Sequence, residues 1–248
     1  MTRLKRKLKP IFKSRVRLID NIGGNERDNM SVLQRFVLLA IIVLQCDLQE
    51  IRAQDNNLNK QNLKYYVVGF VGGLRSPEDI NQGVVQIRNR IRELDRDEIQ
   101  IDTYSHWHWR KSYKQIFHMI DDNKDGRISD EELNNAPKLI IYGHSLGGWA
   151  VNKLERKLKK VRIPVELSVQ IDSVGIGDAS VPDNVKTAIN YYQRTQFIPR
   201  GEKIIKAKDA NSTIILGNIL IKNVRHEALA RESQISDLIF NKLVGSRR

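Results

Sequence analysis

Residues 138–154 read KLIIYGHSLGGWAVNKL, and the rest of the chain is best understood around them. The short apolar run 139–142 follows a proline and is typical of a buried strand. Residues 143–147 then form the pattern Gly-x-Ser-x-Gly, and a helix-like stretch runs over 148–160. The expected order is therefore strand, sharp turn and helix, with Ser145 at the turn.

The two glycines of this pattern have a steric purpose. A serine at such a turn is held in a strained backbone conformation, and its neighbours two before and two after must be small because strand and helix pass close together. The hydroxyl of Ser145 would project at a helix N-terminus, where partial positive charge favours an anionic intermediate. The backbone amide of Leu146 could donate to that oxyanion. The alternative is a glycine-rich turn with an incidental serine.

In these residues the chain resembles the α/β-hydrolase superfamily, and its lipases and esterases in particular, in which the form GHSLGG is common. The resemblance covers roughly residue 63 to the C-terminus. It implies a three-layer α/β fold, with a mostly parallel sheet, helices on both faces and a reduced N-terminal part. It also implies a serine nucleophile, an acid and a histidine base in that order along the chain.

The resemblance points to further site residues on the flanking strands. Residues 65–71 form a strong strand candidate that ends in Gly72-Gly73. By resemblance, the amide of Phe70 would be the second oxyanion donor, with Val71 as its alternative. An ordinary strand-to-helix turn is the competing interpretation.

The candidate acid is Asp172, which ends an alternating strand at 165–171, because the ends of parallel strands form the active-site edge of such a sheet. Asp178 and Asp183 are its rivals. The candidate base is His226, which comes late in the chain before a final amphipathic helix that extends to about residue 243.

His144 adjoins Ser145, but its side chain is expected to point elsewhere, and His118 lies on a helix. The predicted catalytic triad is therefore Ser145, Asp172 and His226.

Residues 121–132 read DDNKDGRISDEE and fit the twelve-position EF-hand calcium loop throughout. Calcium takes six to eight hard oxygen ligands, which a tightly curled loop can supply, and Gly126 stands at the sixth position where the sharp turn falls. The predicted Ca²⁺ ligands, including one backbone carbonyl at the seventh position, are Asp121, Asn123, Asp125, Arg127, Ser129 and Glu132. A solvated acidic turn is the alternative.

This loop precedes the strand that leads to Ser145, and it has no partner loop in the sequence. Its exit helix is expected to be short, because Asn134, Asn135 and Pro137 end it. Sensor EF-hands depend on a pair of helices that opens. A structural role for calcium is therefore favoured over a sensing role.

Weaker patterns lie on both sides of this centre. Two histidines in the HWHW stretch at 106–109 could bind a metal from an extended segment, but no third ligand is near, so aromatic packing is favoured. The remaining patterns predict a helix over 77–94, a strand over 98–104, a helix over 181–192, and short strands or an edge hairpin at 204–205 and 214–216.

Residues 1–62 are predicted to be an N-terminal extension, and residues 63–248 the hydrolase domain that includes the calcium loop. The chain of 248 residues has a formal net charge of +13. A basic run at 3–17 could contact nucleic acid or anionic lipid, but no nucleic-acid-binding motif supports that role. A disordered arm, or codons upstream of the true start, is favoured. The single cysteine, Cys46, rules out an intrachain disulfide framework.

The apolar run 36–44 is too short to span a bilayer and suits the hydrophobic region of a signal peptide. Met30 could be the initiator, and Ala53 could precede the cleavage site, although Asp47, Glu50 and Arg52 are unusual there. The sequence therefore predicts a secreted or periplasmic protein without a transmembrane span, with a cytoplasmic location as the alternative.

The predicted function is hydrolysis of carboxylic esters, lipid esters included, by a serine hydrolase with a structural calcium ion. The absence of an obvious long lid insertion favours an esterase over an interfacial lipase. Two rivals remain open: an acyltransferase or thioesterase with the same triad, and a non-catalytic calcium-binding protein on a hydrolase scaffold. No nucleic-acid partner is expected.

Overall fold

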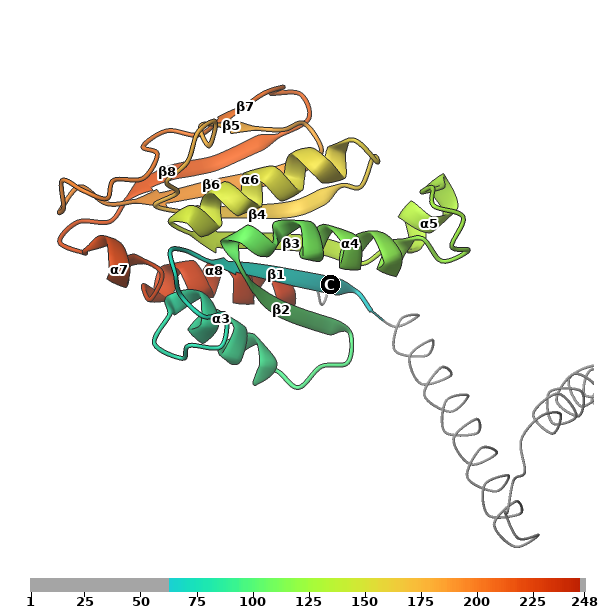
Figure 1. Cartoon of the computed structure of the whole chain (residues 1–248), viewed down its shortest axis with the longest axis horizontal. Coiled ribbons are helices and arrows are strands. Elements are labelled where there is room, and N and C mark those ends of the chain that lie inside the picture. Colours follow the sequence, from blue (N-terminus) through green and yellow to red (C-terminus); the bar gives the residue numbers. More distant parts are fainter. Residues whose placement is uncertain (1–62, 246–248) are drawn as a thin grey trace, which may run out of the picture. The chain divides into compact units, whose positions relative to one another are not determined.

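A six-stranded parallel sheet forms the centre of the computed structural model, which describes residues 63–245 (Figure 1). The strand order is β2-β1-β3-β4-β6-β8, and every neighbouring pair is parallel. The strands are β1 (Tyr65–Val71), β2 (Ile99–Ser105), β3 (Lys138–His144), β4 (Val165–Ile171), β6 (Val185–Tyr192) and β8 (Ile214–Leu220). Two further short strands, β5 (Ser180–Val181) and β7 (Lys206–Ala207), pair with each other.

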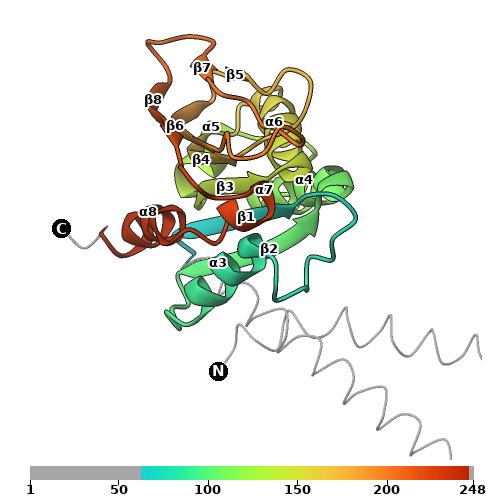
Figure 2. The same cartoon turned by 90° about the vertical axis from the view of Figure 1, so that its left-hand side faces the viewer.

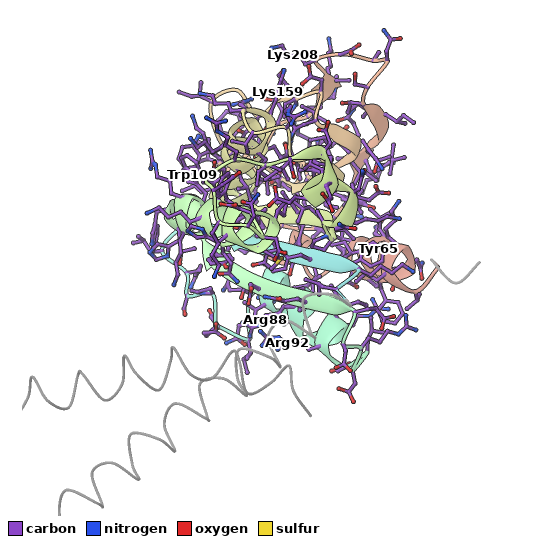
Figure 3. All side chains as sticks on the ribbon, turned by 90° about the vertical axis from the view of Figure 1, so that its right-hand side faces the viewer. Tyr65, Arg88, Arg92, Trp109, Lys159 and Lys208 are labelled. Carbon is purple, nitrogen blue, oxygen red and sulfur yellow. The ribbon has the colours of Figure 1, made fainter. Side chains whose placement is uncertain are left out.

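Helices cover both faces of this sheet and make the fold three-layered (Figures 1 and 2). The longer helices are α3 (Gly83–Arg92), α4 (Trp109–Ile120), α6 (Leu146–Lys159) and α8 (Ser233–Val244). The shorter ones are the 3₁₀ turn η1 (His106–His108), α5 (Asp130–Asn135) and α7 (His226–Leu229). Helices α3 and α8 pack on one face, and α4 and α6 on the other. In Figure 3, Lys159 of α6 and Arg88 of α3 accordingly lie on opposite sides of the sheet.

The alternation of side chains explains how one strand serves both layers. In β1, Tyr65 and Val67 pack toward α3 and α8, whereas Tyr66, Val68 and Phe70 pack toward α4 and α6. Every residue of β1 is buried. A strand with helices on both faces needs such a continuous apolar run, which is the pattern read in the sequence.

Because the six strands are parallel, their carboxyl ends meet at a single edge of the sheet. The turns that follow β1, β3, β4 and β6 all lie at this edge. The fold therefore gathers residues from distant parts of the chain there.

Several predicted elements are confirmed and others are wrong. The strands at 65–71 and 165–171 and the helix after Ser145 are confirmed. The predicted helix over 181–192 is wrong, since this segment contains β5 and β6. Of the two alternatives for 204–205 and 214–216, a strand is confirmed at 214–216, which lies in β8, and the edge hairpin is wrong, because β8 lies parallel to β6 at the end of the sheet.

The helix predicted over 77–94 begins only at Gly83. Residues before it are held in turns, because the carboxylate of Asp79 accepts hydrogen bonds from the backbone of Asn81 (3.0 Å) and the side chain of Gln82 (2.9 Å). Residues 106–109 are helical and not extended, so the two histidines do not share one side of a strand.

The predictions for the N-terminal extension, namely the basic run 3–17, the start at Met30, the signal-like run 36–44 and Cys46, lie outside the described residues. Within 63–245, no helix combines the length and apolar character needed to cross a membrane.

Candidate active site

Ser145 occupies the turn between β3 and α6 in a strained backbone conformation, with φ 59° and ψ −125°. For a residue other than glycine, such a conformation costs on the order of 1–3 kcal/mol and persists only where the surroundings fix it. Here the Ser145 amide donates to the carbonyl of Ile171 (3.0 Å), and its carbonyl accepts from the amides of Gly148 (2.9 Å) and Val174 (3.1 Å). The turn is thus anchored to β4 on one side and to its own helix on the other.

The glycines on either side of Ser145 are required by close backbone contacts. A Cβ atom on Gly143 would lie 2.4 Å from the carbonyl oxygen of Gly147, and one on Gly147 would lie 2.1 Å from that of Phe70. Real Cβ atoms do not approach other atoms so closely. The steric reason predicted for the Gly-x-Ser-x-Gly pattern is confirmed.

Asp172 and His226 form a buried pair, with 2.7 Å between Asp172 Oδ2 and His226 Nδ1. Asp172 follows β4 directly, and His226 begins α7, so 54 residues of chain separate the partners. Asp172 is fully buried and His226 is 5% exposed. The structure therefore brings together two of the residues that the sequence nominated.

A second set of donors holds the Asp172 carboxylate in place. The side chain of Gln193 donates to Oδ2 (3.0 Å), and the backbone amide of Gly201 donates to Oδ1 (3.0 Å). Burial alone would raise the pKa of Asp172, but the hydrogen bonds from His226 and Gln193 outweigh it and hold the pKa below its ordinary value. An ionised carboxylate can only accept, so the shared proton lies on Nδ1 of His226, and Nε2 is left as a basic nitrogen.

His144, which was expected to point away from the site, supports His226 instead. Its Nε2–H donates to the backbone carbonyl of His226 (2.8 Å), and the two imidazole rings lie 4.5 Å apart. Burial, followed by the nearby His226, lowers the pKa of His144 to about 4, so its ring is neutral near pH 7. Neither His144 nor Gln193 carried a sequence signal for this role, because both act through contacts between distant segments.

Ser145 and His226 line one cavity of about 180 Å³ at the carboxyl edge of the sheet. The Ser145 hydroxyl makes no hydrogen bond to His226 here; such bonds are often long before substrate binds. Three larger hollows, of about 590, 450 and 220 Å³, are lined by residues such as Arg96, Asn135 and Lys208 and contain no member of the predicted triad. The smaller cavity is therefore the candidate active site.

Gly72, which follows β1, lies against Ser145. Phe70 is fully buried inside β1. A Cβ on Gly72 would be 2.8 Å from the Cβ of Ser145 and 3.1 Å from the amide nitrogen of Leu146. Leu146 is the first residue of α6, whose first amides have no partner within the helix. The backbone of Gly72 thus lies beside Ser145 and close to the amide of Leu146.

The rival acids lie elsewhere. Asp178 accepts a hydrogen bond from Ser173 Oγ, and burial raises the pKa of Asp178. Asp183 pairs with Lys159 at 2.6 Å on the solvent side of α6. Neither carboxylate contacts His226, so the geometry selects Asp172.

The predicted calcium loop is curled by its own hydrogen bonds. Asp121 is buried, and its carboxylate accepts from the backbone amides of Asp125 and Gly126, each at 3.1 Å. Gly126 has φ +79°, which suits a glycine at a sharp turn. The side-chain oxygens that the sequence assigned to calcium are of the hard type that this ion prefers.

Glu132, however, is engaged as a helix cap. Its carboxylate accepts from the backbone of Asp122 (2.8 Å) and from both the amide (2.9 Å) and the hydroxyl (2.8 Å) of Ser129. The pKa of Glu132 is lowered to about 2, chiefly by the hydrogen bonds that its carboxylate accepts from Ser129. Across residues 63–245, no three or more His, Cys, Asp or Glu side chains are grouped to hold a metal. The oxygen donors of the loop are of the type that calcium binds, but in this structure their carboxylates do not point to one common position.

Comparison with known proteins gives a likeness of fold only. No protein-family model and no curated protein matches the chain. Similar solved structures include Est1E from Butyrivibrio proteoclasticus (10% identity, TM-score 0.40), a cutinase-like protein from Cryptococcus sp. (12%, 0.41) and human thioesterase 2 (8%, 0.40). Each match covers 73% of this chain and, in the same order, 89%, 94% and 95% of the other.

The fold is α/β-hydrolase-like. This assignment rests on the parallel sheet, the helices on both faces and the strained serine turn between β3 and α6. At identities and TM-scores this low, the similar structures add no argument about activity.

Proposed function

We propose that the protein is a serine hydrolase of carboxylic esters. The observation that carries this proposal is the buried Asp172–His226 pair, which shares a cavity with Ser145 at its strained turn. A strained serine, a histidine with its basic nitrogen free, and an ionised acid behind that histidine form the arrangement that acyl transfer requires.

In the proposed reaction, Ser145 Oγ attacks the ester carbonyl while Nε2 of His226 takes its proton. Asp172 orients the imidazole through Nδ1 and stabilises its charged form. The amides of Leu146 and Gly72 donate to the oxyanion as it forms. His226 then returns the proton to the leaving alcohol, and water, activated by the same histidine, releases the acyl group from Ser145.

A fluorophosphonate probe tests the nucleophile directly. The purified full-length protein should become labelled, and mass spectrometry should locate the adduct on Ser145, because these probes react with activated serines. Ser145→Ala should abolish labelling. Ser76→Ala is the matched control, since Ser76 is an exposed serine in the turn after β1. A folded protein that takes no label would support the non-catalytic alternative.

The same triad would serve an acyltransferase or a thioesterase. Product analysis separates these activities: transfer of the acyl group to an added alcohol indicates a transferase, and faster cleavage of a thioester than of the matched ester indicates a thioesterase.

We also propose that the loop at 121–132 binds calcium in a structural role. Two observations support this proposal: the order of the oxygen donors along the loop, and the turn that is closed by the hydrogen bond from the Gly126 amide to the Asp121 carboxylate. The ion would be held by the six predicted ligands and would offset most of the negative charge of their three carboxylates. Glu132 would have to exchange its hydrogen bonds with the Ser129 backbone and hydroxyl for the ion.

Removal of calcium is therefore expected to lower the melting temperature. With calcium about 100-fold above its dissociation constant, the shift on adding EGTA should be about 5–10 °C, measured by scanning calorimetry. Glu132→Gln should remove the shift, and Glu131→Gln, at an exposed non-ligand position, should keep it. An unchanged melting curve in EGTA, together with no heat of calcium binding, would show that the loop is only an acidic turn.

A further inference from the structure

The cavity at Ser145 is lined by polar and charged groups. Apart from the triad residues, its glycines and His144, the lining side chains are Arg75, Gln82, Glu227 and Arg231. Among the described residues that line it, none is aliphatic and none is Phe, Tyr or Trp. Ligand pockets are usually lined mainly by apolar side chains and are commonly 300–1,000 Å³ in volume, whereas this one is about 180 Å³. A long acyl chain would therefore meet no aliphatic side chain and no Phe, Tyr or Trp among the lining residues.

Arg75 is free to bind a ligand. It lies in the turn after β1, close to Gly72, which touches Ser145, and its side chain is exposed. Within residues 63–245, Arg75 forms no hydrogen bond or ion pair. Its charge helps to lower the pKa of Asp79, but this is the smallest of the effects that act on that carboxyl. The Asp79 carboxylate instead accepts hydrogen bonds from the backbone of Asn81 and the side chain of Gln82.

Arg231, which follows α7, also lines the cavity. One of its terminal nitrogens, Nη2, donates to the backbone carbonyl of Asn81 (2.8 Å), which fixes the guanidinium beside the turn that carries Arg75. Its other N–H groups form no further bond to residues 63–245. The acid in the lining, Glu227, lies 3.8 Å from Arg225 and does not pair with either cavity arginine. The cavity therefore presents uncompensated positive charge.

We propose that Arg75 and Arg231 recognise an anionic oxygen group, a carboxylate or a phosphate, on a small ester substrate. This inference rests on the proposed ester hydrolysis. Guanidinium groups bind such anions through paired, charge-assisted hydrogen bonds, so they position the ester as well as attract it. Binding of the anion would bring the ester carbonyl to Ser145 in the orientation that the reaction needs.

Two matched substrate pairs test the proposal on the full-length protein. In the first, 4-acetoxybenzoate is compared with its methyl ester, so that the charge lies on the leaving group. In the second, mono-4-nitrophenyl adipate is compared with 4-nitrophenyl hexanoate, so that the charge lies on the acyl group. The anionic ester of at least one pair should show kcat/KM about 10- to 100-fold above its neutral partner, and the preference should shrink as salt increases. The kcat/KM for 4-acetoxyphenyl phosphate, compared with that for 4-acetoxybenzoate, then shows whether the site prefers a phosphate or a carboxylate.

Arg75→Ala should lower kcat/KM for the preferred anionic ester by about 10- to 100-fold and leave the neutral ester within about twofold. Arg75→Lys should recover part of the loss, because lysine keeps the charge but not the paired geometry. Arg110→Ala is the matched control: this exposed arginine stacks on Trp109 at the start of α4 and does not line the cavity.

Two outcomes would overturn the proposal: no preference for the anion in either pair, or an equal loss on both esters in Arg75→Ala. Failure of the underlying hydrolase proposal would look different. In that case neither ester of either pair would be cleaved, and Ser145 would take no fluorophosphonate label.

Discussion

Replacement of His226 by alanine is expected to lower kcat for ester hydrolysis by about 10⁴- to 10⁶-fold, because Ser145 would lose its base. Asp172→Asn should cost about 10⁴-fold, because the asparagine amide can donate to Nδ1 and so favour the tautomer in which Nε2 carries the proton. The measurement is steady-state hydrolysis of an activated acetate ester, with the melting temperature recorded for each variant to show that it is folded.

Asp178→Asn provides the matched control for Asp172→Asn. Both aspartates are fully buried and follow β4, but Asp178 bonds to Ser173 and not to His226. Its replacement should change kcat by less than tenfold in a folded protein. If Asp178→Asn removed activity and Asp172→Asn did not, the triad assigned from the geometry would be incorrect.

The serine turn could be predicted because its determinants are local. The buried run of β3, the two glycines around Ser145 and the start of α6 lie within one short stretch, and each residue has a steric reason to be there. The sequence order of triad residues also follows from resemblance. The pairing itself does not: Asp172 and His226 meet only because β4 ends, and α7 begins, at the same edge of the sheet.

The predicted helix over 181–192 is wrong because the structure of this segment depends on strand pairing and not on its local sequence. Pro182 and Asp183 resemble a helix start, yet Val185–Tyr192 fills the place between β4 and β8 in the sheet and forms a strand. Tertiary pairing there overrides the local signal. Phe70 as the second oxyanion donor stays a prediction, and we propose Gly72 in its place because Gly72 lies against Ser145. The distance between the end of β1 and Ser145 depends on how β1 and β3 are aligned, which the sequence does not show.

The buried polar groups beneath α6 were also not foreseen. Glu155 of α6 is fully buried, and neither of its carboxylate oxygens has a hydrogen-bond partner. Asn152, one turn earlier, and Ser168 and Gln170 of β4 also hold buried side-chain atoms without partners. Burial raises the pKa of Glu155 to about 8; the nearby Ser168 hydroxyl opposes this effect weakly, without forming a hydrogen bond of ordinary geometry. Glu155 is therefore largely protonated near pH 7.

This burial makes folding sensitive to pH. In the unfolded chain Glu155 titrates near its ordinary pKa of 4.5, so between pH 4.5 and about 8 the folded protein binds more protons than the unfolded one. Stability must then fall as pH rises through this window. His144 has the opposite effect, because its pKa is lowered from 6.5 to about 4 and its contribution is lost as pH falls through that range. Above pH 6.5, His144 is largely neutral in both the folded and the unfolded chain. Of these two groups, only Glu155 then still changes the free energy of unfolding with pH.

The free energy of unfolding should therefore fall by about 2 kcal/mol between pH 6.5 and pH 9 on account of Glu155, and Glu155→Gln should remove this loss because glutamine has nearly the same shape without a titrating proton. Urea denaturation at a series of pH values measures the difference. Glu131→Gln, which removes a charge from an exposed position of α5, should keep the wild-type slope. Equal slopes for wild type and Glu155→Gln would mean that water reaches the carboxylate and keeps it ionised, and the polar groups beneath α6 would then have to be described as hydrated rather than dry.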